Sequence, residues 1–311
     1  MQLSDLCIFT EPQQGATYDD LLAVATRAET LGFGGFFRSD HFLKMGSVTG
    51  LPGPTDAWVT LGGLARDTST IRLGTLVSPV TFRSPGLLAV SVAQVDQMSG
   101  GRVELGIGGG WYEAEHRAYV FDFGTQGSRS DRLEDQLAII TGMWDTAAGE
   151  KFNFVGKVYS VTESPGLPKP VQDRLPIIMG GSGRKRTPAL AARYADEFNV
   201  SFKPLDTFNE QKERVAAACT AANRTRPMRY SAALVVCAGG NEAEVSRRAA
   251  AIGRTPAQLR EDGAAGSADE TAATIRSYVD AGCDRIYLQV LDLADLDHLD
   301  FIAAEVAPLL A

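Results

Sequence analysis

Strand-like and helix-like segments alternate along the whole of this sequence, and that alternation limits the available folds more than any other feature. Apolar runs rich in β-branched and aromatic residues are followed by amphipathic helical patterns eight times, with strands expected at residues 3–10, 35–39, 71–77, 102–106, 176–179, 197–201, 229–237 and 285–290. Successive strand–helix units are typical of an α/β fold with a parallel sheet. Eight units in 311 residues match one (β/α)8 TIM barrel, so the length does not require two domains.

The helical patterns have recognisable ends. In the first, apolar residues from Leu21 to Leu31 recur at spacings of three and four, with candidate caps over 17–20 and Gly32 as a stop. The last helix repeats this pattern over 296–309. These ends support the count of strand–helix units.

Two segments depart from the simple repeat. Near 150–172, apolar residues alternate around Gly156 before a proline-rich stretch, which predicts a hairpin-like insertion leading to the fifth strand. Near 255–268 an extra helical or irregular segment precedes the last unit. Each is either surface elaboration or a lid over the site, because long βα loops often carry function. We expect residues 1–311 to form a single domain with these two insertions.

Composition narrows the class of protein. A net charge of −8 and a pI near 5.0 argue against a general nucleic-acid binder. The four cysteines are widely spaced and form no C-x-x-C pair, so they indicate core positions in a reducing compartment and no metal site. No run reaches the roughly 18 consecutive apolar residues of a membrane span. The N-terminus lacks a leader pattern, so a cytoplasmic protein without a membrane partner is expected.

Functional residues of a barrel of this kind lie where strands end, and one of only three histidines lies there. His41 follows the second strand and has Asp40 beside it, so the acid could hold the ring while His41 exchanges a proton near neutral pH. The alternative is that His41 only packs on a bound ring or caps a loop. His116 is expected to be structural, and His298 solvated, because both lie in helical patterns.

Two glycine-rich turns follow other strands. The turn from Gly106 to Gly110 opens a helix through Trp111, and allows the backbone to approach a flat or anionic ligand; the alternative is a tight βα turn. It matches neither the dinucleotide fingerprint nor a P-loop. The turn Gly180-Gly181-Ser182-Gly183 precedes Arg184, Lys185 and Arg186, which predicts a phosphate or carboxylate site unless the run is merely solvated. Gly266-Ser267 is a weaker anion site, because two acids follow it.

The same loops resemble the bacterial luciferase-like monooxygenase superfamily, and within it the oxidoreductases that use coenzyme F420, a deazaflavin. The resemblance is carried by SDHFL at 39–43, GTLV at 74–77, FRSP at 82–85, GRVELGIGGGWYEAEHRAY at 101–119, LPKPVQ at 167–172 and LPIIMGGSGRKRT at 175–187. A further match, AGCDRIYLQV, lies near the C-terminus. The resemblance therefore implies a luciferase-like TIM barrel with the deazaflavin at the C-terminal ends of the strands.

The resemblance also implies roles for individual residues. Asp40 and His41 would lie near the reactive edge of the cofactor ring, and Leu76-Val77 matches the place of a non-proline cis peptide beneath that ring. The other residues expected to bind the cofactor, its phosphate and its oligoglutamate tail are Gly106, Gly108, Gly110, Gly180, Gly181, Ser182, Arg184, Lys185 and Arg186.

The sequence departs from the sugar-phosphate dehydrogenases of this family. Their catalytic tryptophan and glutamate are matched by Met45 and Trp111, so glucose 6-phosphate is not the expected substrate. Trp111, Tyr112 and Met45 are expected to line a more apolar substrate pocket, with Glu113 as a weak candidate acid.

These observations predict an oxidoreductase that transfers a hydride between coenzyme F420 and a small organic substrate, with His41 as proton donor or acceptor. One alternative is an FMN-dependent monooxygenase served by a separate flavin reductase. Another is a non-catalytic protein that binds a flavin or deazaflavin. A homodimer is expected because relatives often form one.

Overall fold

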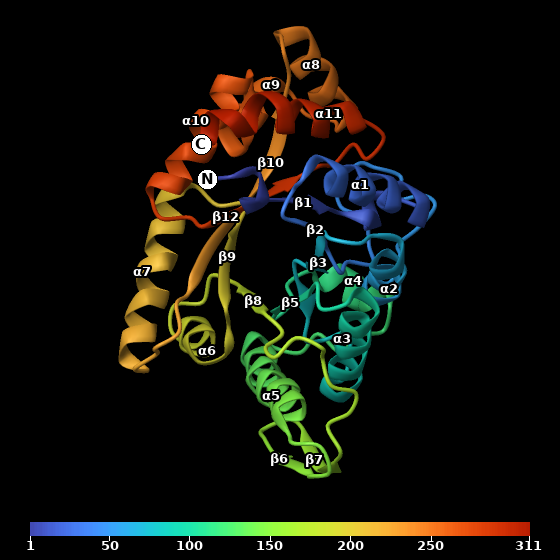
Figure 1. Ribbon diagram of the computed structural model, residues 1–311, viewed down its shortest axis with the longest axis vertical. Helices are drawn as coiled ribbons and strands as arrows, with labels where there is room; N and C mark the ends of the chain where they lie inside the picture. Colours follow the sequence, from blue (N-terminus) through green and yellow to red (C-terminus); the bar gives the residue numbers. More distant parts are fainter.

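The computed structural model, which describes residues 1–311, forms a closed barrel of parallel strands surrounded by helices (Figure 1). Its eight strands are β1 (Leu6–Thr10), β2 (Gly35–Arg38), β3 (Arg72–Thr75), β5 (Val103–Gly108), β8 (Ile177–Gly180), β9 (Glu197–Ser201), β10 (Arg229–Ala238) and β12 (Arg285–Gln289). Pairing of β1 with β12 closes the ring, with Cys7 opposite Tyr287. The predicted (β/α)8 TIM barrel is confirmed.

Each predicted strand segment overlaps one barrel strand, with differences at the ends. Residues 3–5 form a 3₁₀ turn before β1. The predicted strand 71–77 stops at Thr75, because a cis peptide between Leu76 and Val77 follows and the chain then turns to pair β4 (Ser78–Pro79) with β5. The cis peptide implied by the resemblance is therefore present.

The helices follow the strands as the sequence predicts. They are α1 (Tyr18–Leu31), α2 (Ala57–Asp67), α3 (Pro85–Ser99), α4 (Glu113–Ala118), α5 (Gln126–Asp145), α6 (Arg186–Tyr194), α7 (Leu205–Ala221), α8 (Glu242–Ala251), α9 (Pro256–Asp262), α10 (Ala268–Asp280) and α11 (Leu296–Phe301). The α1 helix begins at a capping box between Thr17 and Asp20 and ends at Gly32, which is left-handed at φ 92°. None of the helices combines the length and apolar composition that a membrane crossing requires.

Both segments outside the simple repeat have regular structure. Within 150–172, β6 (Phe152–Val155) and β7 (Ser160–Ser164) form an antiparallel hairpin, which lies beside α5 at one end of the molecule (Figure 1). Lys157 in its turn forms an ion pair with Glu134 of α5 at 2.9 Å. Within 255–268, α9 is followed by β11 (Ala264–Gly266), which pairs with β10.

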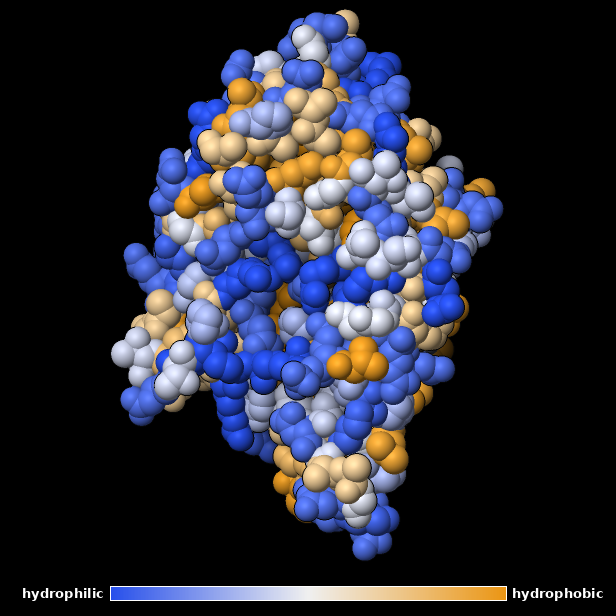
Figure 2. Space-filling model, viewed as in Figure 1, coloured by the Kyte–Doolittle hydropathy of each residue, from blue (hydrophilic) through white to orange (hydrophobic).

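Alternation along the strands separates two apolar layers. In β1, Leu6 and Ile8 join the main core between sheet and helices, while Cys7 and Phe9 point into the barrel with Tyr287. The space-filling view shows a hollow in the middle of one face, with mostly hydrophilic residues around it (Figure 2). Around β1, the barrel interior is therefore filled by apolar side chains.

Charged residues are buried where the strands begin. Arg285 of β12 donates to Glu104 of β5 at 2.7 Å and lies 3.1 Å from Glu197 of β9. Tyr287 donates to Glu197 at 2.6 Å, and Arg72, the first residue of β3, donates to Glu104. Both carboxylates are only 2% exposed, so this network neutralises charges that water cannot reach.

The prediction that His298 is solvated is wrong. Its side chain is buried, and Nε2 accepts a hydrogen bond from the Ala238 backbone N–H at 3.0 Å. Burial lowers the pKa of His298 to about 3, and the charge of Arg248 acts in the same direction. A neutral ring that satisfies the end of β10 therefore occupies this position.

Candidate active site

The candidate residues lie at the C-terminal ends of neighbouring strands. Asp40 and His41 follow β2, the Leu76-Val77 peptide follows β3, and the Trp111-Tyr112 pair follows β5. Because the strands are parallel, these ends form one rim of the barrel. The structure therefore brings together three groups of residues that are far apart in the sequence.

His41 is held by a carboxylate, but not by Asp40. Its Nδ1 lies 2.9 Å and 3.1 Å from the two carboxylate oxygens of Glu115, at the start of α4. Glu115 also accepts a hydrogen bond from the Phe42 backbone N–H at 3.0 Å. The expectation that Asp40 holds the ring is wrong, because the Asp40 carboxylate is bound by Arg83 and Ser78 instead.

Asp40 has a different partner. Arg83 donates to its two carboxylate oxygens at 2.5 Å and 3.1 Å, and Ser78 donates to it at 2.6 Å. The same guanidinium reaches Asp56, the N-cap of α2, at 2.5 Å. Asp40 is 1% exposed, and its buried ion pair with Arg83 joins the loops that follow β2 and β4.

A second carboxylate, Glu11, directly follows β1 on the same rim. Burial raises the pKa of Glu11, and the nearby charge of His41 opposes that effect. Of these two acids, only Glu115 is hydrogen-bonded to His41.

Aromatic side chains form one wall beside His41. Trp111 stacks on Tyr112 with ring centroids 5.3 Å apart, and both meet the imidazole edge-on at 5.7 Å and 6.0 Å. The Tyr112 hydroxyl donates to the Lys44 carbonyl at 3.0 Å, which places the loop with Met45 next to this wall. Trp111 is 65% exposed, a large apolar area in solvent next to a titratable ring.

His116 has the structural role predicted for it. Its Nδ1 must donate to the Tyr112 carbonyl at 2.8 Å, so its Nε2 accepts from the Thr81 hydroxyl at 2.7 Å. Helix α4 begins at Glu113, not at Trp111 as predicted, and Glu113 forms an exposed pair with Arg117. Glu113 is therefore not the acid of the site.

The glycines after β5 serve more than one purpose. A Cβ at Gly106 would collide with the Thr75 carbonyl, and one at Gly108 would lie 2.9 Å from Val77. These two glycines allow the Leu76-Val77 segment to pack against β5. Gly110 has a φ of 77°, and at Gly109 a Cβ would have no neighbour within 4 Å.

The loop after β8 leaves two cations free. Gly181 has a φ of 138°, and α6 begins at Arg186. Of the three cations, Arg186 already has acidic partners, Asp131 at 2.6 Å and Glu134 at 3.1 Å, and its contact with a cofactor stays a prediction. Exposed Arg184 and Lys185 have no acidic partner.

The weaker anion site at Gly266-Ser267 is already filled. The Glu270 carboxylate accepts from the Ser267 backbone N–H at 2.7 Å, and Ser267 caps α10 in return. An acid of the protein therefore takes the place that an anion would need.

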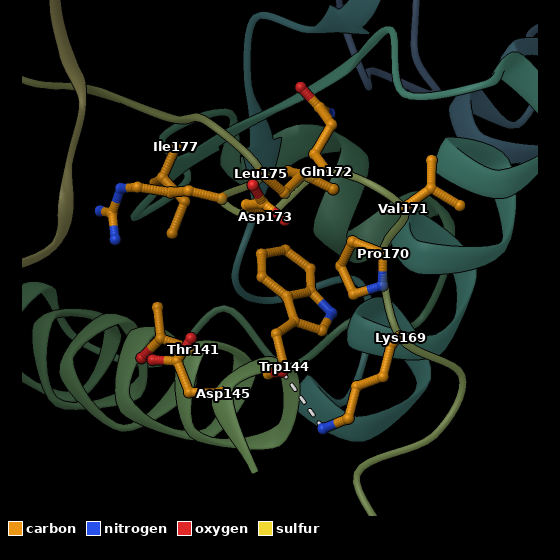
Figure 3. Close-up of a pocket in the computed structure, with 11 residues that line it drawn as sticks. Thr141, Trp144, Asp145, Lys169, Pro170, Val171, Gln172, Asp173, Leu175 and Ile177 are labelled. Carbon is orange, nitrogen blue, oxygen red and sulfur yellow. Dashed lines mark hydrogen bonds between the residues drawn. The ribbon is translucent and has the colours of Figure 1, made fainter. Parts of the chain in front are cut away.

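A separate cavity of about 310 Å³ lies between the end of α5 and the start of β8 (Figure 3). Lys169 on its wall donates to the carbonyls of Met143 and Trp144 at 2.7 Å and 3.1 Å. Residues 169–175 of its wall come directly before β8, at the N-terminal end of that strand. The cavity therefore lies at the opposite end of the barrel from His41, which follows the C-terminal end of β2. No group of His, Cys, Asp and Glu side chains anywhere in the structure is placed to hold a metal ion.

Sequence reasoning identified the rim but missed Glu115 and Arg83. Both lie in matched stretches, at 101–119 and 82–85, but neither directly follows a strand. Glu115 is separated from His41 by 74 residues. Only the fold shows which acid meets the histidine.

Comparison with known proteins places this arrangement in a family. A family model described as luciferase-like monooxygenase matches residues 4–285. The F420-dependent glucose-6-phosphate dehydrogenase of Microbacterium testaceum (strain StLB037) is 34% identical over 196 residues, which are 62% of this chain and 56% of that protein. The chain spans about half the length of the curated relatives it matches.

Two solved structures share the fold. One is an F420-dependent secondary alcohol dehydrogenase in complex with an F420-acetone adduct, with a TM-score of 0.82, 18% identity and 98% of both chains covered. The other is a type II Baeyer-Villiger monooxygenase, the oxygenating constituent of 3,6-diketocamphane monooxygenase from Pseudomonas putida, in complex with FMN. Its TM-score is 0.75 at 19% identity, covering 94% of this chain and 92% of that one.

Proposed function

The chain belongs to the luciferase-like monooxygenase family, and from this premise we propose that it is an oxidoreductase that transfers a hydride between coenzyme F420 and a small organic substrate. The observation that carries the choice of cofactor is the free pair of cations, Arg184 and Lys185, at the glycine-rich turn after β8. An otherwise acidic protein places them where the resemblance puts the cofactor's phosphate and oligoglutamate tail. The F420-dependent relative from Microbacterium testaceum supports the same choice.

Two of the glycine turns at the rim leave backbone uncovered. A Cβ at Gly109 would meet nothing within 4 Å, and one at Gly180 would meet only the Asn199 carbonyl at 3.6 Å. Bare backbone at these two turns allows a flat ring and a phosphate to approach closely. Together with Gly181, Ser182 and the two cations, these turns would hold the cofactor.

The protein's own groups would then divide the remaining tasks. When bound, the deazaflavin supplies or accepts the hydride. His41 gives a proton to the substrate or takes one from it, because its Nε2 has no partner within the protein. Trp111, Tyr112 and Met45 bind the apolar body of the substrate and exclude water, while Asp40 holds the loops through Arg83.

An FMN-dependent monooxygenase is the second candidate. A neighbour of the same fold is in complex with FMN, and two cations also suit a single phosphate. That function would need a separate flavin reductase. In either case we propose a single-domain protein that acts as a homodimer in the cytoplasm. A protein that only binds a flavin would not need the ion pair between His41 and Glu115, so we favour an enzyme over that alternative.

Anaerobic turnover tests the choice. Reduced coenzyme F420 should be oxidised when apolar ketones, enones or quinones are supplied together with the protein, because hydride transfer needs no oxygen. Under air, FMN kept reduced by a separate reductase should cause no protein-dependent product formation. Oxygen-dependent product formation with FMN, and no oxidation of reduced F420 by any acceptor, would contradict the proposal.

A further inference from the structure

Glu115 is the buried acid at the rim that touches His41, and it makes three polar contacts. Its oxygens lie 2.9 Å and 3.1 Å from His41 Nδ1, and Oε2 accepts from the Phe42 N–H at 3.0 Å. The carboxylate is 1% exposed, whereas the His41 side chain is 17% exposed. One side of the imidazole is therefore held inside the protein and the other side is open.

These contacts determine where the protons are. The Phe42 backbone N–H can only donate, so Glu115 Oε2 must accept. If Glu115 is a carboxylate, it has no proton to give, and the hydrogen between it and His41 belongs to Nδ1. The lone pair of a neutral His41 is consequently on Nε2, which has no hydrogen-bond partner in the protein.

We propose that Glu115 is a positioning residue for catalysis: it selects the Nδ1–H form of His41 and thereby makes Nε2 the atom that exchanges a proton with the substrate. This inference rests on the function proposed above. In the reducing direction, one atom of the acceptor's double bond gains the hydride and the other gains the proton from Nε2. The ring passes from doubly protonated to neutral, and the reverse reaction returns that proton to Nε2.

The neighbouring groups support this assignment over a merely structural one. Asp40, adjacent to His41 in sequence, is fully engaged by Arg83 and Ser78 and does not compete for the ring. The Trp111 and Tyr112 rings pack edge-on against the imidazole, which limits its rotation about the Glu115 contact. A carboxylate that orients a histidine through Nδ1–H also stabilises the positive charge that the ring carries while it holds both protons.

Nitrogen NMR of the protein labelled with ¹⁵N-histidine tests the proton positions without any cofactor. The chain has only three histidines, and the signals missing from the His41→Ala spectrum identify those of His41. At a pH where the ring is neutral, His41 should show a protonated Nδ1 and a bare Nε2. His116 donates from Nδ1 and serves as an internal reference. A wild-type His41 with its proton on Nε2 would overturn the proposal.

Glu115→Gln tests the consequence. Its amide oxygen must still face the Phe42 N–H, so the amide NH₂ faces His41 and the ring is expected to change to the Nε2–H form. We expect kcat to fall roughly 10- to 100-fold with KM unchanged, because the imidazole is present in the wrong form. Glu113→Gln removes the same charge from an exposed position on the same helix and should change neither the NMR signals nor kcat.

A double variant separates positioning from general damage. In His41→Ala, the further change Glu115→Gln should lower kcat no more, since the residue it positions is gone. An additional loss there, or an unchanged tautomer in Glu115→Gln, would overturn the proposal. A changed tautomer with an unchanged kcat would also overturn it, and would remove His41 from the proposed mechanism. If the protein does not use F420 at all, the NMR result on the apoprotein still decides whether Glu115 selects the tautomer.

Discussion

Replacement of His41 by alanine is expected to lower kcat by roughly 10²- to 10⁴-fold and to leave the affinity for coenzyme F420 unchanged. The imidazole is the titratable group at the rim whose outer nitrogen has no protein partner, while the proposed cofactor contacts lie in the loops after β5 and β8. Steady-state rates with an acceptor found in the anaerobic screen, together with a fluorescence titration of F420, measure the two quantities separately.

The alanine variant should remain folded. Glu115 keeps its hydrogen bond from the Phe42 N–H, and the vacated space opens to solvent because His41 is 17% exposed on its outer side. The melting temperature, measured alongside, serves as the control. A variant with wild-type kcat would show that the proton comes from elsewhere, and Glu11 on the same rim would be the next residue to replace.

Replacement of Arg285 by methionine is expected to lower the free energy of unfolding by about 3–5 kcal/mol, because it leaves buried charges without their partner. Arg285 contacts Glu104 at 2.7 Å and Glu197 at 3.1 Å, and both carboxylates are 2% exposed. Arg72 still reaches Glu104 and Arg229 still lies 3.6 Å from Glu197, but both arginines are partly exposed, and no second buried cation replaces Arg285. Urea unfolding at neutral pH measures the loss.

Two controls accompany that measurement. Arg226→Met removes a half-exposed partner of Asp196 and should cost less than about 1 kcal/mol. Adding Glu104→Gln and Glu197→Gln to Arg285→Met should recover part of the stability, because the unpaired charges are gone. If Arg285→Met is as stable as the wild type, the buried network does not hold the barrel ends together.

The same network predicts a pH dependence. Burial alone would raise the pKa of Glu104, but Arg285 and Arg72 outweigh it and lower the pKa to about 2 from its ordinary 4.5. A depressed carboxyl pKa contributes stability above pH 4.5, and that contribution is lost as the pH falls toward 2. The free energy of unfolding of the wild type should therefore fall between pH 4.5 and 2. The difference in this free energy between the wild type and Arg285→Met should shrink over the same range, because protonation neutralises the unpaired acids of the variant.

Local sequence signals were sufficient for the barrel. Each of the eight strands is an apolar run flanked by turn residues, and the capping box at Thr17 defines the start of α1. The short strands β4 and β11 could not be predicted in the same way, because two or three residues carry no pattern and their pairing depends on the neighbouring strand. His298 was misjudged for a similar reason: its partner is a backbone N–H at the end of β10.

The site was predictable in its position but not in its partnerships. The fold places strand ends on one rim, so His41 and the loop after β8 could be identified from the sequence. Which carboxylate meets His41, and which cation of the basic run is already neutralised, depend on contacts across tens of residues. Glu115 and Arg186 show that such pairings follow from tertiary packing.

A parallel titration of the apoprotein with coenzyme F420 and with FMN tests the central claim most directly. F420 should bind more tightly than FMN. Its affinity should fall with rising salt, and should weaken when Arg184 and Lys185 are replaced by glutamine, since both cations are free to meet its anionic tail. Arg186→Gln is the matched control, because that cation is already paired with Asp131 and Glu134. Tighter binding of FMN, or an F420 affinity indifferent to both salt and the two cations, would contradict the account.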